Sequence, residues 1–265
     1  MIKTSRVKNW DGFIEFDLSV EGSLGRILES QKISMVINLV GDTSSSKSKG
    51  LGESQRKELF AQFRQSEKLL AGKTRLIHVG SGAEYGSAAT PYSECSKPLP
   101  MSDYGDGKLE ETEFFLGLAD SGVEGLILRP SIIFGSSQVG HMLIPSAIKS
   151  FRDGVPFKVN HPEQLRDFLY VKDFAQAVLA AVKSNWGPGK IFNVGSGTCL
   201  TVGEFISELA QVMKVSADLF DSSPGPSSVS AHRVPEMNTS LIRGELDWLP
   251  AFDYKSAISD MVREL

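Results

Sequence analysis

Short apolar runs alternate along this chain with segments whose apolar residues recur at helical spacing. The runs span residues 35–40, 75–79 and 125–130, and the helical segments between them span residues 53–70 and 104–118. Strands separated by helices favour a parallel sheet with helices on both faces, so we expect an α/β fold. Such sheets carry their binding sites at the carboxyl ends of the strands. The residues that follow Val40, Val79 and Leu128 are therefore the first candidates for function.

Composition and charge exclude several classes of protein. The chain has 265 residues, of which 41% are hydrophobic, and this is enough to bury a full core. A net charge of −4 argues against a basic surface for nucleic acid. The longest apolar runs have the length of strands, so we expect neither a membrane span nor a secretion signal. Cys95 and Cys199 offer neither a disulfide framework nor metal-ligand spacing, and we expect a cytoplasmic protein without a metal site.

Tyr104 and Lys108 form the pair with the clearest chemical meaning. They stand four residues apart in a segment of helical pattern, which puts both side chains on one face of the helix. A lysine ammonium beside a phenol favours the phenolate, which can exchange a proton with a sugar or alcohol oxygen. Taken alone, the spacing favours an exposed helix start with a solvated lysine.

Ser81 adds a second polar group at a predicted strand end. It follows the run of residues 75–79, so its hydroxyl lies at the carboxyl edge of the sheet. There it can bind the same oxygen that Tyr104 protonates. The alternative is that Gly80-Ser81-Gly82 is a simple turn.

Seven motifs occur in one order along the chain. They are HVGSGAEYG at 78–86, PYSE at 91–94, YGDGK at 104–108, LRPSIIFG at 128–135, RDFLYVKD at 166–173, FNVGSG at 192–197 and LDWLP at 246–250. Each motif is loose, but together they resemble the extended short-chain dehydrogenase/reductase family, specifically the NAD-dependent sugar-nucleotide epimerases and dehydratases. The resemblance runs from about residue 14 to the C-terminus.

The resemblance implies hydride chemistry on a nucleotide-activated sugar, with NAD or NADP as the cofactor. Ser81 matches the residue that binds the reacting oxygen, and Tyr104 matches the acid/base. Lys108 matches the lysine that favours the tyrosine phenolate and holds the nicotinamide ribose. Members of the family are often dimers through helices that include the one bearing the tyrosine, so a homodimer is expected.

Further positions match binding residues of the family. For the cofactor they are Asp17 near the adenine, Leu39, Val40 and Gly41 under the dinucleotide, and Pro130 and Ser131 near the nicotinamide. For the substrate phosphates they are Arg166 and Arg233. Two of these positions have structural alternatives: Asp17 could cap a helix from Ser19 onward, and Arg166 could pair with Asp167 or Asp173.

The glycine-rich fingerprint of the family is not found in the sequence. Gly80-Ser-Gly82 and Gly195-Ser-Gly197 lack the third glycine and do not open the first helix. We therefore expect a Rossmann-like parallel sheet that lacks its first βαβ unit. Three explanations stay open: Met1 could be a wrong or internal start, a partner or second copy could supply the missing layer, or the chain could be a non-catalytic sugar-nucleotide binder that takes no dinucleotide.

Other departures bear on the reaction and on the domain boundary. Dehydratases of the family carry Asp-Glu directly after the serine or threonine, where this chain has Gly82 and Ala83, and Glu84 comes one position late. This weakens a 4,6-dehydratase interpretation and leaves an epimerase or a 4-keto reductase. After residue 135 the regular alternation ends, and Gly, Pro and polar residues cluster at 135–140 and 221–230. We therefore expect a partial cofactor domain over 1–135 and a mainly sugar-nucleotide lobe over 136–265, interleaved with the first.

Overall fold

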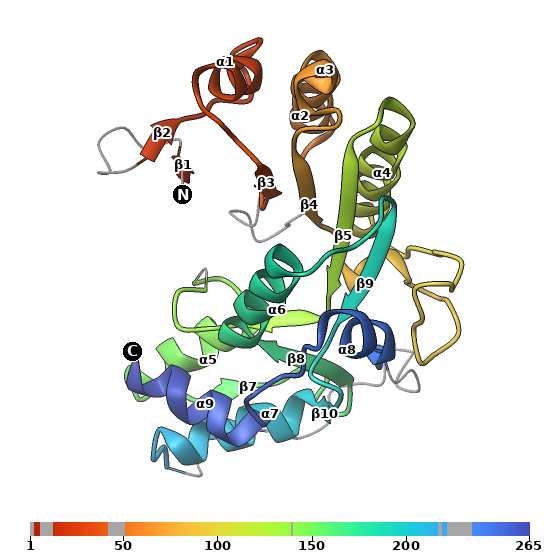
Figure 1. Cartoon of the computed structure of the whole chain (residues 1–265). Coiled ribbons are helices and arrows are strands. Elements are labelled where there is room, and N and C mark those ends of the chain that lie inside the picture. The colour runs from red at the N-terminus through yellow and green to blue at the C-terminus, as the bar shows by residue number, and fades with distance from the viewer. Residues whose placement is uncertain (1–2, 6–12, 42–50, 139, 217–218, 222–234) are drawn as a thin grey trace.

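A four-stranded parallel sheet forms the centre of the protein. The computed structural model describes residues 3–5, 13–41, 51–138, 140–216, 219–221 and 235–265. The sheet has the order β3-β4-β5-β9 with every pair parallel (Figure 1). Its strands are β3 (Met35–Asn38), β4 (Arg75–Val79), β5 (Glu124–Pro130) and β9 (Lys190–Val194). All four carboxyl ends therefore lie along one edge, as the sequence predicted.

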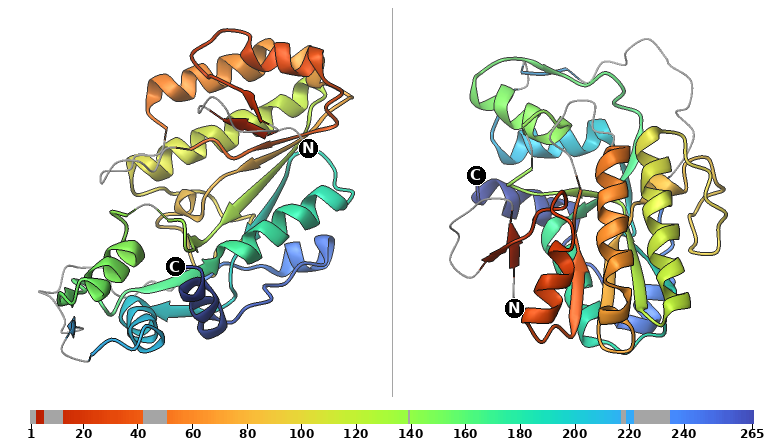
Figure 2. Two further views of the ribbon diagram at one scale, coloured as in Figure 1. Left: turned by 90° about the vertical axis from the view of Figure 1, so that its left-hand side faces the viewer. Right: turned by 90° about the horizontal axis from the view of Figure 1, so that it is seen from above.

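Helices cover both faces of this sheet because successive strand residues point to opposite sides. Leu76 and Ile127 pack in one core with the helices of the first half, and Ile77 and Leu126 pack in another with later helices. The first layer holds α1 (Ser23–Ser30), α2 (Glu53–Gln65), α3 (Glu67–Leu70), α4 (Asp103–Gly117) and the 3-10 helix η2 (Leu118–Ser121). The opposite layer holds α6 (Val171–Lys183) and α8 (Ser240–Leu246) (Figure 2).

A smaller lobe has its own sheet and core. Strands β10, β8 and β6 pair in that order, with β8–β6 parallel and β10–β8 antiparallel. The lobe consists of β6 (Ile132–Phe134), α5 (Leu143–Arg152), β7 (Phe157–Lys158), β8 (Leu165–Tyr170), β10 (Cys199–Thr201), α7 (Val202–Val212), β11 (Phe220–Asp221) and α9 (Tyr254–Arg263). Its core is built around Phe134, Phe168 and Phe205. The chain returns from this lobe to the main sheet through β9, so the two parts interleave.

The N-terminal strands stand apart from the main sheet. Strand β1 (Lys3–Ser5) pairs in parallel with β2 (Phe13–Glu15) as a separate two-stranded sheet. Within the described residues, no strand pairs with the outer side of β3, and Ile37 of β3 and Leu39 just after it are exposed. This is the open strand edge expected for a Rossmann-like sheet without its first βαβ unit.

Candidate active site

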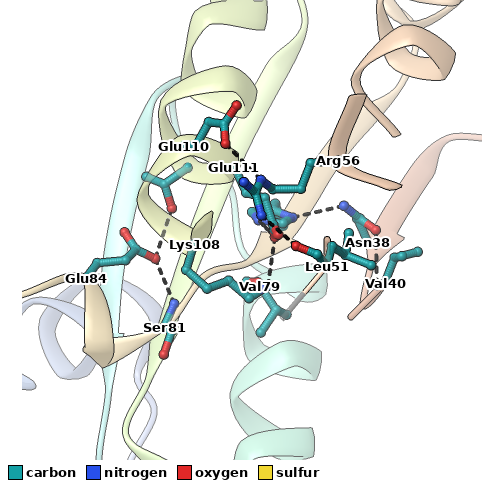
Figure 3. Close-up of polar contacts among 12 residues, drawn as sticks. Asn38, Val40, Leu51, Arg56, Val79, Ser81, Glu84, Lys108, Glu110 and Glu111 are labelled. Carbon is teal, nitrogen blue, oxygen red and sulfur yellow. Dashed lines mark hydrogen bonds and ion pairs between the residues drawn. The ribbon is translucent and has the colours of Figure 1, made fainter. Parts of the chain in front are cut away.

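The segments that bear the three residues predicted to carry the chemistry come together where β4 ends and α4 begins. Ser81 lies two residues beyond Val79, the last residue of β4. The Lys108 ammonium donates a hydrogen bond to the Val79 carbonyl oxygen at 3.1 Å (Figure 3). A Cβ added to Gly105 would lie 2.7 Å from the Ala83 carbonyl oxygen, so the turn of α4 that bears Tyr104 presses directly against the turn after Ser81. Their catalytic roles stay predictions.

The Ser81 turn is closed by reciprocal hydrogen bonds. Ser81 is the N-cap of the 3-10 helix η1 (Gly82–Glu84), and its Oγ accepts from the Ala83 N–H at 3.2 Å. The Glu84 carboxylate accepts from the Ser81 N–H at 2.7 Å. This capping box fixes the Ser81 backbone, and because Oγ acts as an acceptor toward Ala83, its O–H is left to donate to a ligand.

Glu84 is buried in an ion pair behind this turn. Its Oε2 lies 2.7 Å from Nε of Arg129, and its Oε1 accepts from the Thr112 hydroxyl at 3.1 Å. The Arg129 guanidinium also stacks over the ring of Tyr85, with Cζ 4.8 Å from the ring centroid. Burial raises the pKa of Glu84, and the Arg129 charge and the hydrogen bonds oppose that rise. Both carboxylate oxygens are occupied by structural partners.

The absence of a side chain at residue 80 makes room for this carboxylate. A Cβ on Gly80 would stand 2.5 Å from Glu84 Oε1 and 3.1 Å from Thr112 Oγ1. We expect Gly80→Ala to lower the free energy of unfolding by about 1–3 kcal/mol, because the added methyl displaces a packed, hydrogen-bonded group. Urea denaturation of the parent and the variant measures this difference.

Gly117→Ala is the matched control for that prediction. An added Cβ at Gly117, the last residue of α4, meets nothing within 4 Å. The same substitution there is expected to leave stability unchanged or to raise it by up to about 1 kcal/mol. Equal effects at both positions would show that the space at Gly80 is not needed for Glu84.

Lys108 is buried beside a second cluster of polar groups. Its Nζ donates to Glu111 Oε2 at 2.8 Å, and the same oxygen lies 3.4 Å from Nε2 of His78. The sequence suggested only packing for His78, and its ring does stack on Phe115 at 4.2 Å between centroids. Its Nδ1 also contacts the Asn38 amide nitrogen at 2.9 Å. Burial lowers the pKa of His78 to about 4, so the ring is neutral at pH 7.

The strand-end residues predicted to carry a dinucleotide lie at the carboxyl edge of the sheet, and their role toward the cofactor stays a prediction. Leu39 is 63% exposed just after β3, and a Cβ on Gly41 would meet nothing within 4 Å. Pro130 ends β5, and the hydroxyl of Ser131 donates to Asp167 Oδ1 at 3.0 Å. The backbone at Ser131 is also held in place, because its N–H donates a hydrogen bond to the Val194 carbonyl oxygen.

Among the described residues, fewer groups are placed to bind the pyrophosphate half of a dinucleotide. The turn from β2 into α1 holds Gly22 at φ 68° rather than the glycine triplet that lets a backbone approach a pyrophosphate. Asp17 closes this turn, because its Oδ1 accepts from both the N–H and the hydroxyl of Ser19. The helix that follows begins at Ser23, so Asp17 caps a turn and not a helix, and its role toward adenine stays a prediction.

The two arginines predicted to bind substrate phosphates have different outcomes. Arg166 lies at the start of β8 and donates to Gln164 Oε1 and to the Leu165 carbonyl, each at 2.7 Å. It does not pair with either aspartate suggested as an alternative: Asp167 binds Ser131 and Ser196, and Asp173 accepts from backbone N–H groups at 251 and 252. Arg233 lies outside the described residues.

Several functional neighbours were not predicted from the sequence. Arg129 lies within the LRPSIIFG motif, which did not indicate its pairing with Glu84, and Thr112 and Asn38 lie outside the seven motifs. Glu111 could have been noticed, because it stands three residues after Lys108 and therefore on the same helix face. In the described part of the chain, no group of His, Cys, Asp and Glu side chains could hold a metal ion, and no helix is long and apolar enough to cross a membrane.

Comparison with known proteins finds relatives that match this site-bearing chain over most of its length. The NAD dependent epimerase/dehydratase family matches residues 2–195. The dTDP-6-deoxy-L-talose 4-dehydrogenase (NAD(P)(+)) of Kitasatospora kifunensis is 26% identical over 96% of this chain and 81% of that protein. The dTDP-D-glucose 4,6-dehydratase of Bos taurus is 26% identical over 71% of this chain, which spans about half (54%) of that protein.

A solved structure agrees with the fold. The UDP-glucose 4-epimerase of Thermotoga maritima, determined with UDP-glucose, superposes with a TM-score of 0.82 over 99% of this chain and 89% of that chain, at 19% identity. The likeness confirms the Rossmann-like α/β fold expected from the sequence, and the match to the family's sequence pattern covers well over half of the chain. The family suggested by the seven motifs is confirmed, and the chain belongs to the NAD-dependent epimerase/dehydratase family.

Proposed function

We propose that this protein catalyses NAD(P)-dependent hydride transfer at a hydroxyl-bearing or keto carbon of a nucleotide-activated sugar, without eliminating water. The observation that carries the proposal is the meeting of the Ser81 turn, the first turn of α4 and the Lys108 ammonium at the end of β4. A hydroxyl, a phenol and an ammonium from these elements are the groups needed to move a proton on a sugar oxygen.

In this proposal each site residue has a defined role. In the direction of oxidation, Tyr104 removes the proton of the sugar hydroxyl, and Ser81 donates a hydrogen bond to the same oxygen. Lys108 favours the phenolate form of Tyr104 and holds the nicotinamide ribose, while Pro130 and Ser131 lie beside the nicotinamide. Bound NAD or NADP supplies the hydride acceptor or donor. In the direction of reduction the same proton returns from Tyr104 to the sugar oxygen.

The surroundings of Ser81 disfavour a dehydratase. Elimination of water needs an acid beside the reacting carbon. A Cβ on Gly82 would stand 3.2 Å from the Pro130 carbonyl oxygen and 3.4 Å from Met237 Cε, so an aspartate at this position would require these neighbours to shift by a few tenths of an ångström. Ala83 has no acidic group, and the Glu84 carboxylate is engaged by Arg129 and Thr112. The chain thus offers no carboxylic acid at the places where dehydratases carry one.

The substrate class rests on the smaller lobe and on the relatives. We assign residues 1–135 mainly to the cofactor and residues 136–265 mainly to the sugar nucleotide, with β9 shared. Arg166 on β8 is a half-buried guanidinium whose fork of donors suits phosphate oxygens. The relative from Kitasatospora kifunensis is a dTDP-6-deoxy-L-talose 4-dehydrogenase, so we assign a dTDP-6-deoxyhexose as the first substrate to test. A homodimer through the layer that contains α4 is the expected assembly.

The proposal is tested by supplying the purified protein with NAD or NADP and dTDP-6-deoxyhexoses. We expect the absorbance of reduced nicotinamide to appear. We also expect mass spectrometry to detect a product that has lost two hydrogens and no water. With dTDP-glucose, we expect no product that has lost water. Loss of water would indicate a dehydratase. Binding of the sugar nucleotide without any binding of dinucleotide in calorimetry would support the alternative of a non-catalytic binder.

A further inference from the structure

The Lys108 ammonium is held by two fixed acceptors inside the protein. The residue is 7% exposed, and its Nζ donates to the Val79 carbonyl at 3.1 Å and to Glu111 Oε2 at 2.8 Å. An ammonium has three N–H groups in tetrahedral directions. With two of them bound to acceptors on β4 and α4, the direction of the third is set by the protein.

Glu111 lies beside a neutral histidine in a defined tautomer. The Val40 N–H donates to Asn38 Oδ1 at 3.1 Å, so the amide nitrogen of Asn38 faces His78 and donates to its Nδ1 at 2.9 Å. The His78 proton therefore sits on Nε2, which faces Glu111 Oε2 at 3.4 Å. The carboxylate is 1% exposed; it accepts a hydrogen bond from the ammonium and has the histidine ring beside it.

The other charges near Lys108 are matched by partners of their own. Arg56 of α2 packs over Gly107, and its Nε pairs with Glu110 Oε2 at 2.8 Å. Glu84, from the turn after β4, pairs with Arg129 of β5. Among the described residues, Glu111 is the anion in direct contact with the ammonium. The pKa of Glu111 is held below its usual range: burial raises it, but the His78 ring beside it and the Lys108 charge outweigh that effect.

We propose that Glu111 is a positioning residue that fixes the Lys108 ammonium and offsets part of its charge, so that Glu111 sets the pH range in which Tyr104 acts. The proposal rests on the proposed function. An ammonium favours the phenolate of a tyrosine one helical turn away, and an adjacent carboxylate weakens that field. Tyr104 and Lys108 are four residues apart on α4 and so share one helix face. The partial neutralisation of the Lys108 charge by Glu111 therefore reduces the electrostatic stabilisation of the Tyr104 phenolate.

The decisive variant is Glu111→Gln, which keeps an oxygen acceptor for Lys108 and removes the negative charge. We expect the acid limb of the pH profile of kcat/KM for sugar oxidation to move to lower pH by roughly 0.5–1 unit. Glu111→Asp retains the charge and is expected to keep the limb of the parent. Glu110→Gln is the matched control, because it removes the neighbouring exposed carboxylate, which pairs with Arg56, and is expected to leave the limb in place.

A second readout does not depend on turnover. The ultraviolet absorbance of phenolate is measured as a function of pH in the parent and in Tyr104→Phe. Subtracting the second curve from the first isolates the signal of Tyr104 from those of the other four of the five tyrosines. We expect the midpoint of this difference signal to move lower in Glu111→Gln than in the parent. If the signal moves while no sugar nucleotide is oxidised, the proposed function fails and the role of Glu111 stands. An unmoved midpoint and an unmoved limb in a folded Glu111→Gln protein would overturn the role of Glu111.

Discussion

Replacing Arg129 by methionine is expected to lower the free energy of unfolding by about 3–5 kcal/mol, because it leaves the Glu84 carboxylate buried without its cation. The pair is 2% and 0% exposed at its two side chains, and its N–O distance is 2.7 Å. The carboxylate can escape its charge only by taking up a proton, and burial already raises its pKa. Urea denaturation at neutral pH measures the loss.

Two further variants separate the buried charge from the loss of any ion pair. Lys190→Met breaks the pair with Glu245, which has a similarly short distance of 2.8 Å but is more than one-third exposed on both sides. We expect a change there within about 1 kcal/mol. Adding Glu84→Gln to Arg129→Met removes the stranded charge but keeps an acceptor for the Ser81 N–H, so it should restore part of the lost stability. A double variant as unstable as the single one would show that packing, and not charge, dominates at this position.

The central strands of the main sheet, β4 and β5, were predictable because they are buried on both faces. Such strands appear in the sequence as continuous apolar runs, and the observed β4 (Arg75–Val79) and β5 (Glu124–Pro130) agree with the runs at 75–79 and 125–130. The helix expected over residues 53–70 is interrupted at Ser66, whose φ of −96° and ψ of 0° end α2. Helix α5 (Leu143–Arg152) and strand β10 (Cys199–Thr201) were not predicted. Strand β10, in the smaller lobe, has only three residues, which are too few to display the alternation of apolar and polar residues that identifies a strand.

The site residues whose positions follow from sequence spacing were predictable. Those brought together only by tertiary packing were not. Tyr104 and Lys108 share a helix face by virtue of their spacing, and Ser81 follows a strand that the sequence makes clear. Glu84 and Arg129 are 45 residues apart in the sequence, and only the register of β4 against β5 brings them together. His78 has the neighbours of a packed core residue in the sequence, whereas its polar partners come from a neighbouring strand and from α4.

The proton step assigned to Tyr104 has the largest expected kinetic effect. Tyr104→Phe keeps the ring and removes the hydroxyl, so the sugar oxygen loses its proton acceptor while the helix start is preserved. Positioned acid/base groups contribute about 10²–10⁴ in rate. We expect kcat for sugar-nucleotide oxidation to fall by roughly that factor. The affinity for dinucleotide, measured by calorimetry, should stay within a few-fold of the parent because Lys108 keeps its anchors at Val79 and Glu111.

Tyr254→Phe is the matched control for this loss, because Tyr254 is also a half-buried tyrosine at the start of a helix, on α9 of the smaller lobe. It should retain the kcat of the parent. A hydroxyl that only stabilised the fold would lower the melting temperature in Tyr104→Phe and leave kcat per folded molecule nearly intact. Retention of kcat in a folded Tyr104→Phe protein would remove the proton step from Tyr104, and the hydride chemistry proposed at the Ser81 turn would then need another acid/base.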